Sequence, residues 1–266
     1  HALSRDAGLL VIENGTVVRT AEVLSPDGSQ QILARAVQVS RLEKGAFDLI
    51  YHAGSNLAAI LSGKTDGIKL IFGNAKGREL VSSLYGEWPI NRLMYHQIEN
   101  FMSRLSEGIS PNDGVLRILE MGAGTGGTSQ WLIPLLASLP MRVEYTFTDL
   151  APSFVAAARK RFSQYDFIKY RTHDIEHGAP EDLRNSQHIV IASNAIHATH
   201  DITKSASHVK EFLRSDGLLL MVEMTTPLLW VDVIFGLFEG WWLFDDGRSH
   251  AVTNEADWKR HLLAAG

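Results

Sequence analysis

The stretch that decides the fold is residues 118–127, ILEMGAGTGG, where an apolar run ends in Glu120 and a glycine-rich loop follows. A segment with helical patterning comes directly after the loop. Glycine at such a turn leaves backbone N–H groups bare and lets a helix N-terminus approach a ligand. The pattern therefore predicts a strand, a tight loop and a helix that together hold a nucleotide-like cofactor. It leaves the identity of that cofactor open.

Length and composition favour a globular protein. The chain has 266 residues, of which 45% are hydrophobic, and this is enough for a sizeable core. Its net charge of −5 argues against nucleic-acid binding, because phosphate contacts need a basic surface. No apolar run approaches the roughly 18 residues that span a bilayer. The absence of cysteine excludes disulfides and thiolate metal sites and is compatible with a cytoplasmic location.

Patterning along the chain predicts two domains. Residues 1–112 combine a hairpin signal at Asn14-Gly15 with mainly helical periodicity, clearest at 95–105, and are expected to form a lid or substrate subdomain. The segment 110–114, SPNDG, is the predicted linker. The chain starts without Met and without a signal-peptide pattern, so we expect a piece of a longer polypeptide. No room remains after Gly266 for further strands, so we expect either that the strand predicted at 218–224 is an exposed edge or that the real terminus is not included.

Residues 113–266 are predicted to form an α/β core. Strands are expected at 116–121, 143–148, 167–172, 188–193 and 218–224, and helices at 128–139, 152–165, 203–214 and 254–265. Strands that alternate with helices imply βαβ units and a Rossmann-like parallel sheet. Ligands of such sheets lie beyond the carboxyl ends of the strands.

The glycine loop matches the fingerprints of two cofactors. Gly122, Gly124 and Gly127 satisfy G-x-G-x-x-G, which is typical of dinucleotide enzymes. Glu120 with Gly122, Gly124 and Gly126 equally satisfies the E/D-x-G-x-G-x-G pattern of S-adenosylmethionine enzymes.

Residues at the following strand ends favour S-adenosylmethionine. Asp149 ends the second predicted strand and can accept hydrogen bonds from both ribose hydroxyls. Asp174 and the apolar Ile175 follow the third strand, where they suit the adenine amino group and ring. Asn194 ends the fourth strand, near the expected methionine part, and Leu150 completes the predicted cofactor set. Each polar residue taken alone could equally be a helix cap or a turn former.

Several of these stretches resemble the C-methyltransferase domain of fungal iterative polyketide synthases. The matching blocks are residues 119–128, 145–150, 193–199, 222–225 and 235–242, with Asp246-Gly247-Arg248 close behind. Residues 84–95 are similar to the helical lead-in of the non-reducing, citrinin-synthase-like type.

The resemblance implies a class I S-adenosylmethionine-dependent methyltransferase core behind a mainly helical N-terminal subdomain. It implies methylation at the α-carbon of a poly-β-ketoacyl thioester, with S-adenosylhomocysteine as the product of the donor. The expected partners are an acyl carrier protein, which carries the substrate on phosphopantetheine, and the other domains of the same synthase.

Removal of a proton from that α-carbon needs a base, and His197 is the candidate. It lies three residues past Asn194, just beyond a strand end, and the pKa of free histidine, about 6.5, suits proton abstraction. Glu223, at the end of the next strand of the expected sheet, is predicted to orient the imidazole. The resemblance gives His197 and Glu223 the same roles and adds Tyr85 as a residue of the active site. Each assignment has an alternative. His197 could be an exposed loop residue, and Glu223 could be a buried acid paired with Arg248 or Tyr85. Tyr85 could belong to ordinary helix packing.

The aromatic stretch after residue 225 is a candidate substrate wall. Trp230, Trp241 and Trp242 could line a channel for a flat polyketide, although an aromatic stripe on a helix is more often core. The remaining histidines form no pattern typical of a metal site. Three other functions stay open: an inactive methyltransferase-like scaffold of a megasynthase, a nicotinamide-dependent enzyme, and an O- or N-methyltransferase.

Overall fold

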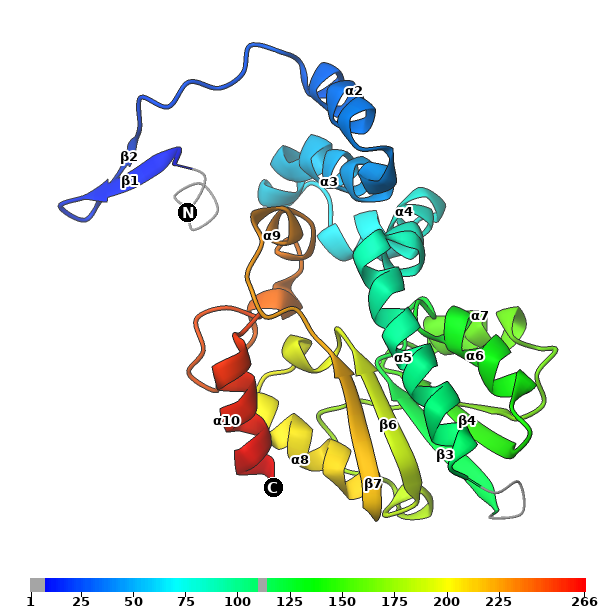
Figure 1. The fold of residues 1–266 in the computed structure, drawn as a ribbon. Coiled ribbons are helices and arrows are strands. Elements are labelled where there is room, and N and C mark those ends of the chain that lie inside the picture. The colour runs from blue at the N-terminus through cyan, green and yellow to red at the C-terminus, as the bar shows by residue number, and fades with distance from the viewer. Residues whose placement is uncertain (1–7, 110–113) are drawn as a thin grey trace. The chain divides into compact units, whose positions relative to one another are not determined.

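In the computed structural model, which describes residues 8–109 and 114–266, the chain divides into two compact units (Figure 1). The first unit contains the chain up to Leu84 together with Pro227–Trp241, and the second contains Tyr85–Thr226 and Trp242–Gly266. This division differs from the predicted boundary at residue 112. Most of the predicted linker, residues 110–113, lies outside the described residues.

The second unit is built on a parallel sheet with the strand order β5-β4-β3-β6-β7 among the described residues. Its strands are β3 (Val115–Met121), β4 (Arg142–Asp149), β5 (Ile168–Thr172), β6 (Gln187–Ser193) and β7 (Leu213–Val222). Each neighbouring pair is parallel, which confirms the predicted α/β fold class. The strand order reverses between β3 and β6, so the crevice that binds ligands in open α/β sheets opens there.

The predicted strands are confirmed to within one residue, except for the last, which was predicted at 218–224 and spans Leu213–Val222. Sequence patterning continued the preceding helix to Arg214 and began the last strand at Leu218, whereas β7 begins at Leu213. Leu213 already pairs with Gln187 of β6, and a register irregularity follows between Gln187 and Ile189. Pairing with the neighbouring strand thus overrides the helical periodicity of the sequence.

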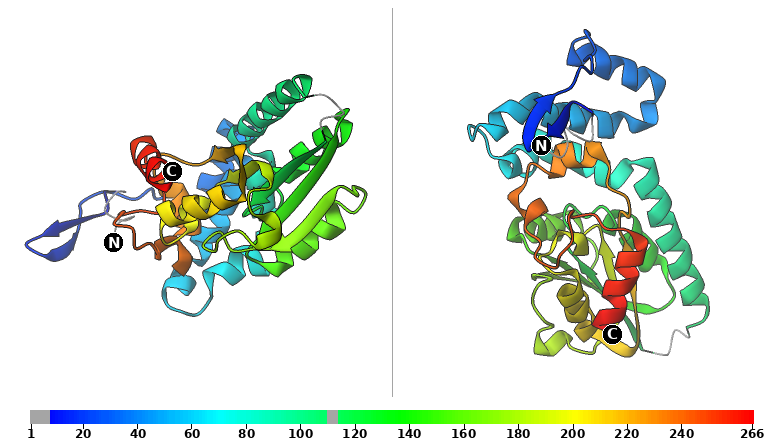
Figure 2. Two further views of the ribbon diagram at one scale, coloured as in Figure 1. Left: turned by 90° about the horizontal axis from the view of Figure 1, so that it is seen from below. Right: turned by 90° about the vertical axis from the view of Figure 1, so that its left-hand side faces the viewer.

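Helices cover both faces of this sheet, as the two further views also show (Figure 2). One face carries α5 (Pro89–Glu107), α6 (Ser129–Ser138) and α7 (Pro152–Arg161); the other carries α8 (Ile202–Phe212) and α10 (Glu255–Ala265). Alternate residues of a strand enter the two cores: Ile118 packs with the first group of helices and Leu119 with the second. Burial of both faces explains the nearly continuous apolar run at the start of the decisive stretch.

Helix α5 explains why the second unit starts earlier in the sequence than predicted. Its residues Ile98 and Met102 are buried in the core that covers one face of the sheet. Pro89 occupies its first turn, where a missing N–H costs nothing. The predicted capped helix near the end is α10, whose Asn254 side chain accepts a hydrogen bond from Asp257 N at 3.0 Å.

The first unit is mainly helical apart from one hairpin. Strands β1 (Leu10–Glu13) and β2 (Thr16–Arg19) pair around Asn14 and Gly15, which both have positive φ as the hairpin signal requires. The other elements are α2 (Ser29–Val39), η1 (Arg41–Glu43), α3 (Lys44–Leu61), a π-helical turn (Lys69–Gly73), α4 (Ala75–Glu87), which continues into the second unit, and α9 (Leu229–Phe235).

The returning segment 227–241 packs within the first unit. Helix α9 contacts α3, and a Cβ atom added to Gly67 would lie 2.5 Å from the carbonyl oxygen of Leu237. Across residues 8–109 and 114–266, no helix is both long enough and apolar enough to cross a membrane.

Candidate functional site

The glycine loop lies at the carboxyl ends of β3 and β6. Gly122, Gly124 and Gly126 have φ values of 59°, 55° and 77°, a backbone region that side chains disfavour. A Cβ atom on Gly122 would lie 2.6 Å from Cβ of Ala195, so the loop closes tightly onto the turn after β6. A Cβ atom on Gly124 would meet only the carbonyl oxygen of Gly122, at 3.9 Å. The loop therefore offers an open, side-chain-free surface at Gly124.

Glu120 supports this loop from inside the protein. Its side chain is fully buried, and its Oε2 accepts hydrogen bonds from the hydroxyls of Ser129 and Tyr145. Burial raises the pKa of Glu120 to about 7, although the hydrogen bonds from Ser129 and Tyr145 oppose this shift. These contacts tie β3 to the helix that follows the loop. A contact of Glu120 with a cofactor stays a prediction.

Asp149 connects the end of β4 with the loop. Its Oδ2 accepts a hydrogen bond from Gly124 N and its Oδ1 accepts one from Ala151 N, both at 2.8 Å. Burial raises the pKa of this carboxyl, while the two backbone N–H groups favour its charged form. Each oxygen keeps a lone pair for a further donor such as a ribose hydroxyl. Leu150 follows with 65% of its surface exposed, as a residue that packs on a bound ring requires.

The remaining predicted cofactor residues lie at the neighbouring strand ends. Asp174 Oδ1 accepts a hydrogen bond from Glu176 N at 3.0 Å, so the turn-forming role that the sequence left open is present. Ile175 Cδ1 lies 3.5 Å from the position that a Cβ atom of Gly122 would take. Asn194 has a φ of 49°, and its buried Oδ1 has no hydrogen-bond partner among the described residues. A buried acceptor without a donor points to a ligand group at this position.

His197 and Glu223 form a buried pair at the ends of β6 and β7. His197 Nδ1 lies 2.6 Å from Glu223 Oε2, and only 9% and 2% of the two side chains are exposed. The other oxygen of Glu223, Oε1, accepts hydrogen bonds from Ala195 N at 3.1 Å and Ile196 N at 2.9 Å. The adjacency of β6 and β7, inferred from the sequence, is thus confirmed. The Glu223 carboxylate therefore binds both the imidazole of His197 and the backbone of the turn that carries it.

Tyr85 lies in the same unit, at the loop. Its carbonyl oxygen accepts a hydrogen bond from the hydroxyl of Tyr95 at 2.7 Å. A Cβ atom on Gly127 would lie 3.0 Å from that hydroxyl and 3.1 Å from Tyr85 Cβ, which explains why position 127 is glycine. Burial, then Tyr95, then the charge of Glu223 raise the pKa of Tyr85 far above its usual value. Its hydroxyl therefore stays protonated and able to donate.

The three tryptophans have different surroundings. Trp241 is buried in the first unit, stacks on Phe235 with a centroid separation of 5.8 Å, and donates its indole N–H to Asp232 at 3.0 Å. This is the core role that the sequence left open. Trp242 belongs to the second unit and is 40% exposed, and Trp230 on α9 is partly buried. Contact of any of them with a substrate stays a prediction.

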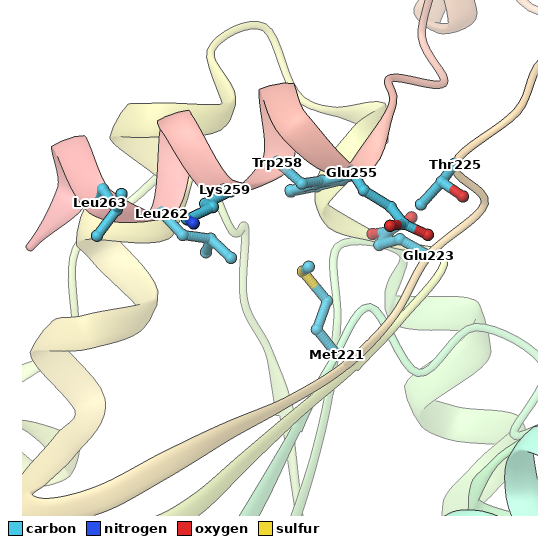
Figure 3. A pocket seen from close by; sticks show the side chains of 8 residues that line it. All are labelled: Met221, Glu223, Thr225, Glu255, Trp258, Lys259, Leu262 and Leu263. Atoms are coloured by element: carbon cyan, nitrogen blue, oxygen red, sulfur yellow. The ribbon is translucent and has the colours of Figure 1, made fainter.

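A pocket lies beside the buried pair, within the second unit. It has a volume of about 500 Å³ and lies between β7 and α10, with Met221 and Glu223 on the strand side and Trp258 on the helix side (Figure 3). Glu223 thus borders this pocket and also holds His197. Among the residues that the structure describes, no group of three or more histidine and acidic side chains could hold a metal ion.

Sequence reasoning missed some residues around the site. Ser129 and Tyr145, which hold Glu120, carry no signal that separates them from ordinary core residues. Asp246 and Arg248 had a signal, because they belong to a block that matched the family, but the sequence suggested only a pairing of Arg248 with Glu223 and no role for Asp246. Both side chains are buried, and Arg248 donates to backbone oxygens of the turn that carries His197.

Comparison with known proteins identifies a methyltransferase domain. A family model described as "Methyltransferase domain" matches residues 119–219. The chain is 55% identical over its whole length to the non-reducing polyketide synthase dbaI of Emericella nidulans. It spans only about a tenth of the length of this and the other curated relatives that it matches.

Two solved structures place the fold. The citrinin polyketide synthase CMeT domain superimposes with a TM-score of 0.95 at 42% identity, over all of this chain and 70% of that chain. The trans-methyltransferase CalH in complex with SAH gives a TM-score of 0.75 at 29% identity, over 90% of this chain and 64% of that chain. S-adenosylmethionine-dependent methyltransferases are therefore the wider family. The chain belongs to the C-methyltransferase domains of polyketide synthases, on the branch of the fungal non-reducing synthases.

Proposed function

We propose that this domain uses S-adenosylmethionine to methylate the α-carbon of a poly-β-ketoacyl thioester, with His197 as the general base. The observation that carries the proposal is the buried pair of His197 and Glu223 at the mouth of the glycine loop. A transfer to carbon needs a base for a weakly acidic C–H, and this pair supplies one.

The loop and the strand ends suit S-adenosylmethionine. The open backbone at Gly124 and the carboxylate of Asp149 would hold the nucleoside, with Leu150 and Ile175 beside the adenine. The unpartnered Oδ1 of Asn194 would accept a hydrogen bond from the ammonium group of the methionine part. When bound, S-adenosylmethionine supplies an electrophilic methyl group. Asp174 is the proposed partner of the adenine amino group and would keep its bond from Glu176 N.

Glu223 would set the protonation of His197. Because Oε2 of Glu223 lies 2.6 Å from Nδ1, the Nδ1–H tautomer donates to the carboxylate. Nε2 is then the ring atom that takes the proton from the α-carbon. The imidazolium so formed is stabilised by the buried negative charge of Glu223.

Tyr85 would stabilise the enolate. Loss of the α-proton places negative charge on the ketone and thioester oxygens, and a protonated hydroxyl can donate to one of them. The charge of Glu223 contributes, after burial and Tyr95, to the raised pKa of Tyr85, and this proximity to the proposed catalytic pair supports the role. Trp230 and Trp242 remain candidates for contact with the polyketide chain.

The substrate is proposed to arrive on an acyl carrier protein. The curated relatives are synthases about ten times longer than this chain, so other domains of the same polypeptide are the expected partners. Carriage on phosphopantetheine rests on the resemblance, and a carrier-bound and a small-molecule thioester can be compared directly as substrates.

Cofactor binding and turnover test the proposal separately. S-adenosylmethionine should raise the melting temperature, and NADPH should leave it unchanged. The protein should then methylate an acetoacetyl thioester mimic at C2. Binding without turnover on any thioester would instead mark a methyltransferase-like scaffold. A methyl group on oxygen or nitrogen would place the enzyme in another class.

A further inference from the structure

The short turn that carries His197, η4 (Ile196–Ala198), is held from two sides. On one side, Glu223 accepts hydrogen bonds from the backbone N–H groups at the start of the turn. On the other side, Arg248 donates to the backbone oxygens: Nη1 bonds to His197 O at 2.8 Å, and Nη2 bonds to Thr199 O. The Glu223 carboxylate thus binds backbone N–H groups of the turn, and the Arg248 guanidinium binds its carbonyl oxygens.

Arg248 is itself fixed by the segment that follows Trp242. Nη1 also donates to Ala251 O at 3.2 Å, and Nε lies 3.1 Å from Asp246 Oδ1. Only 6% and 5% of the Arg248 and Asp246 side chains are exposed. The guanidinium also lies over the ring of Phe244, 5.1 Å from its centroid. Both terminal nitrogens of the cation therefore donate hydrogen bonds, whereas Nε faces Asp246 at ion-pair distance without a hydrogen bond.

Asp246 also binds the backbone beyond the turn. Its Oδ2 accepts a hydrogen bond from Ile202 N, the first residue of α8, at 3.0 Å. The neighbouring Asp245 N donates to His200 O at 2.9 Å. The part of the connection between β6 and α8 that follows His197 is therefore bonded to this one short segment.

Such an arrangement does more than fill space. A buried ion pair brings two desolvation costs, and apolar side chains of the same volume often stabilise a fold as well or better. The planar fork of arginine, however, can fix several carbonyl oxygens at once in one geometry. Proton abstraction depends on such geometry, because a displacement of about 1 Å can lower turnover about 100-fold.

We propose that Arg248, held by Asp246, is a positioning residue that fixes His197 through its backbone and so sets the reach of the imidazole toward the substrate. The inference rests on the proposed function, in which His197 is the base. Arg248 acts through the turn and touches neither substrate nor cofactor.

Arg248→Lys tests the geometry while it keeps the charge. One ammonium group cannot span the oxygens of His197, Thr199 and Ala251 in the arginine geometry. We expect kcat to fall by about 10- to 100-fold, with the Kd for S-adenosylmethionine within about twofold, because the glycine loop is untouched. Arg184→Lys is the matched control: Arg184 also donates to a backbone oxygen and pairs with a carboxylate, but beside Ala179 and Glu211. That control should keep its kcat.

Two additions guard against simple loss of folding. Arg248→Met leaves Asp246 as a buried charge without its cation. The double variant Arg248→Met with Asp246→Asn should therefore melt at a higher temperature than Arg248→Met alone, while its kcat should be as low as that of the single variant. Nitrogen NMR of the His197 ring supplies a readout that general stability does not move. The wild-type ring should show one fixed Nδ1–H tautomer, and Arg248→Lys should broaden or shift its signals.

The outcomes separate this inference from the proposed function. If His197→Ala keeps its turnover, the base assignment fails. If His197→Ala is inactive while Arg248→Lys retains kcat and unchanged ring signals, only the positioning role is overturned. A lower melting temperature of Arg248→Lys with an unchanged kcat at 25 °C would likewise overturn it and leave Arg248 a structural residue.

Discussion

Replacement of Glu223 by glutamine should disable the base by reversing the tautomer of His197. In the wild type, Oε1 faces the N–H groups of Ala195 and Ile196, and Oε2 faces Nδ1. Glutamine must keep its single oxygen toward the backbone donors, so its NH₂ group turns to Nδ1. Nδ1 then has to accept a hydrogen bond, and the ring proton moves to Nε2. The atom proposed to take the substrate proton is thereby blocked.

The size of the effect follows from two losses. In the active tautomer of the variant, the Nδ1–H group of His197 would face the NH₂ group of the new glutamine. Two buried donors would then lack an acceptor, which costs about 1–3 kcal/mol. Loss of the charged acceptor removes about 1.5–3 kcal/mol of stabilisation from the imidazolium. At about 1.4 kcal/mol per tenfold, turnover should fall between about 10² and 10⁴. The fold should survive, because the amide oxygen still accepts from the backbone.

Methyl transfer from labelled S-adenosylmethionine to a β-ketoacyl thioester measures this effect, and isothermal titration checks that cofactor binding is unchanged. Glu176→Gln is the matched control, since Glu176 pairs with His200 Nδ1 at 2.7 Å on an exposed part of the same unit. That control should stay within about twofold of wild-type turnover. A Glu223→Gln enzyme with turnover near that of wild type would refute the tautomer argument.

Three further predictions concern the loop and the fold. Gly122→Ala should lower the free energy of unfolding by about 2 kcal/mol or more and weaken cofactor binding, because φ is 59° and the new Cβ would lie 2.6 Å from that of Ala195; urea titration and calorimetry would measure both. Burial raises the pKa of Glu120 from 4.5 to about 7, so its contribution to stability is full below about pH 4.5 and is lost as the pH rises through 7. The Glu120→Gln variant should lack this slope of up to about 3 kcal/mol in urea titrations at different pH, and an identical slope would contradict the shift. Asn254→Ala should cost about 1 kcal/mol through the lost cap of α10, with turnover unchanged in the methyl-transfer assay.

Much of the second unit could be predicted because local chemistry and global fold agree there. Gly122, Gly124 and Gly126 occupy positive-φ positions of a strand–loop–helix turn, as their spacing predicts. Asp149 and Asn194 stand directly at their strand ends because parallel strands end at a common edge. The pairing of His197 with Glu223 followed from the same rule, once β6 and β7 were taken as neighbours.

The rest depends on contacts between segments far apart in the sequence. The helical pattern of 95–105 gives no sign that Ile98 belongs to the core of the sheet rather than to the preceding helices. The aromatic stretch reads the same whether Trp241 lines a channel or, as found, stacks on Phe235. The chain enters the first unit at Pro227–Trp241 and then returns, and this return brings Asp246 and Arg248 beside the turn of His197. No local periodicity of the sequence indicates such a path.

One NMR experiment shows whether this site methylates carbon with His197 as the base. The protein is incubated with [¹³C-methyl]-S-adenosylmethionine and an acetoacetyl thioester mimic, and the position of the label in the product is read from carbon–carbon coupling. We expect a methyl group on C2 for the wild type and almost none for His197→Ala, although both bind the cofactor. A label on oxygen, or equal labelling of C2 by the two proteins, would contradict this expectation.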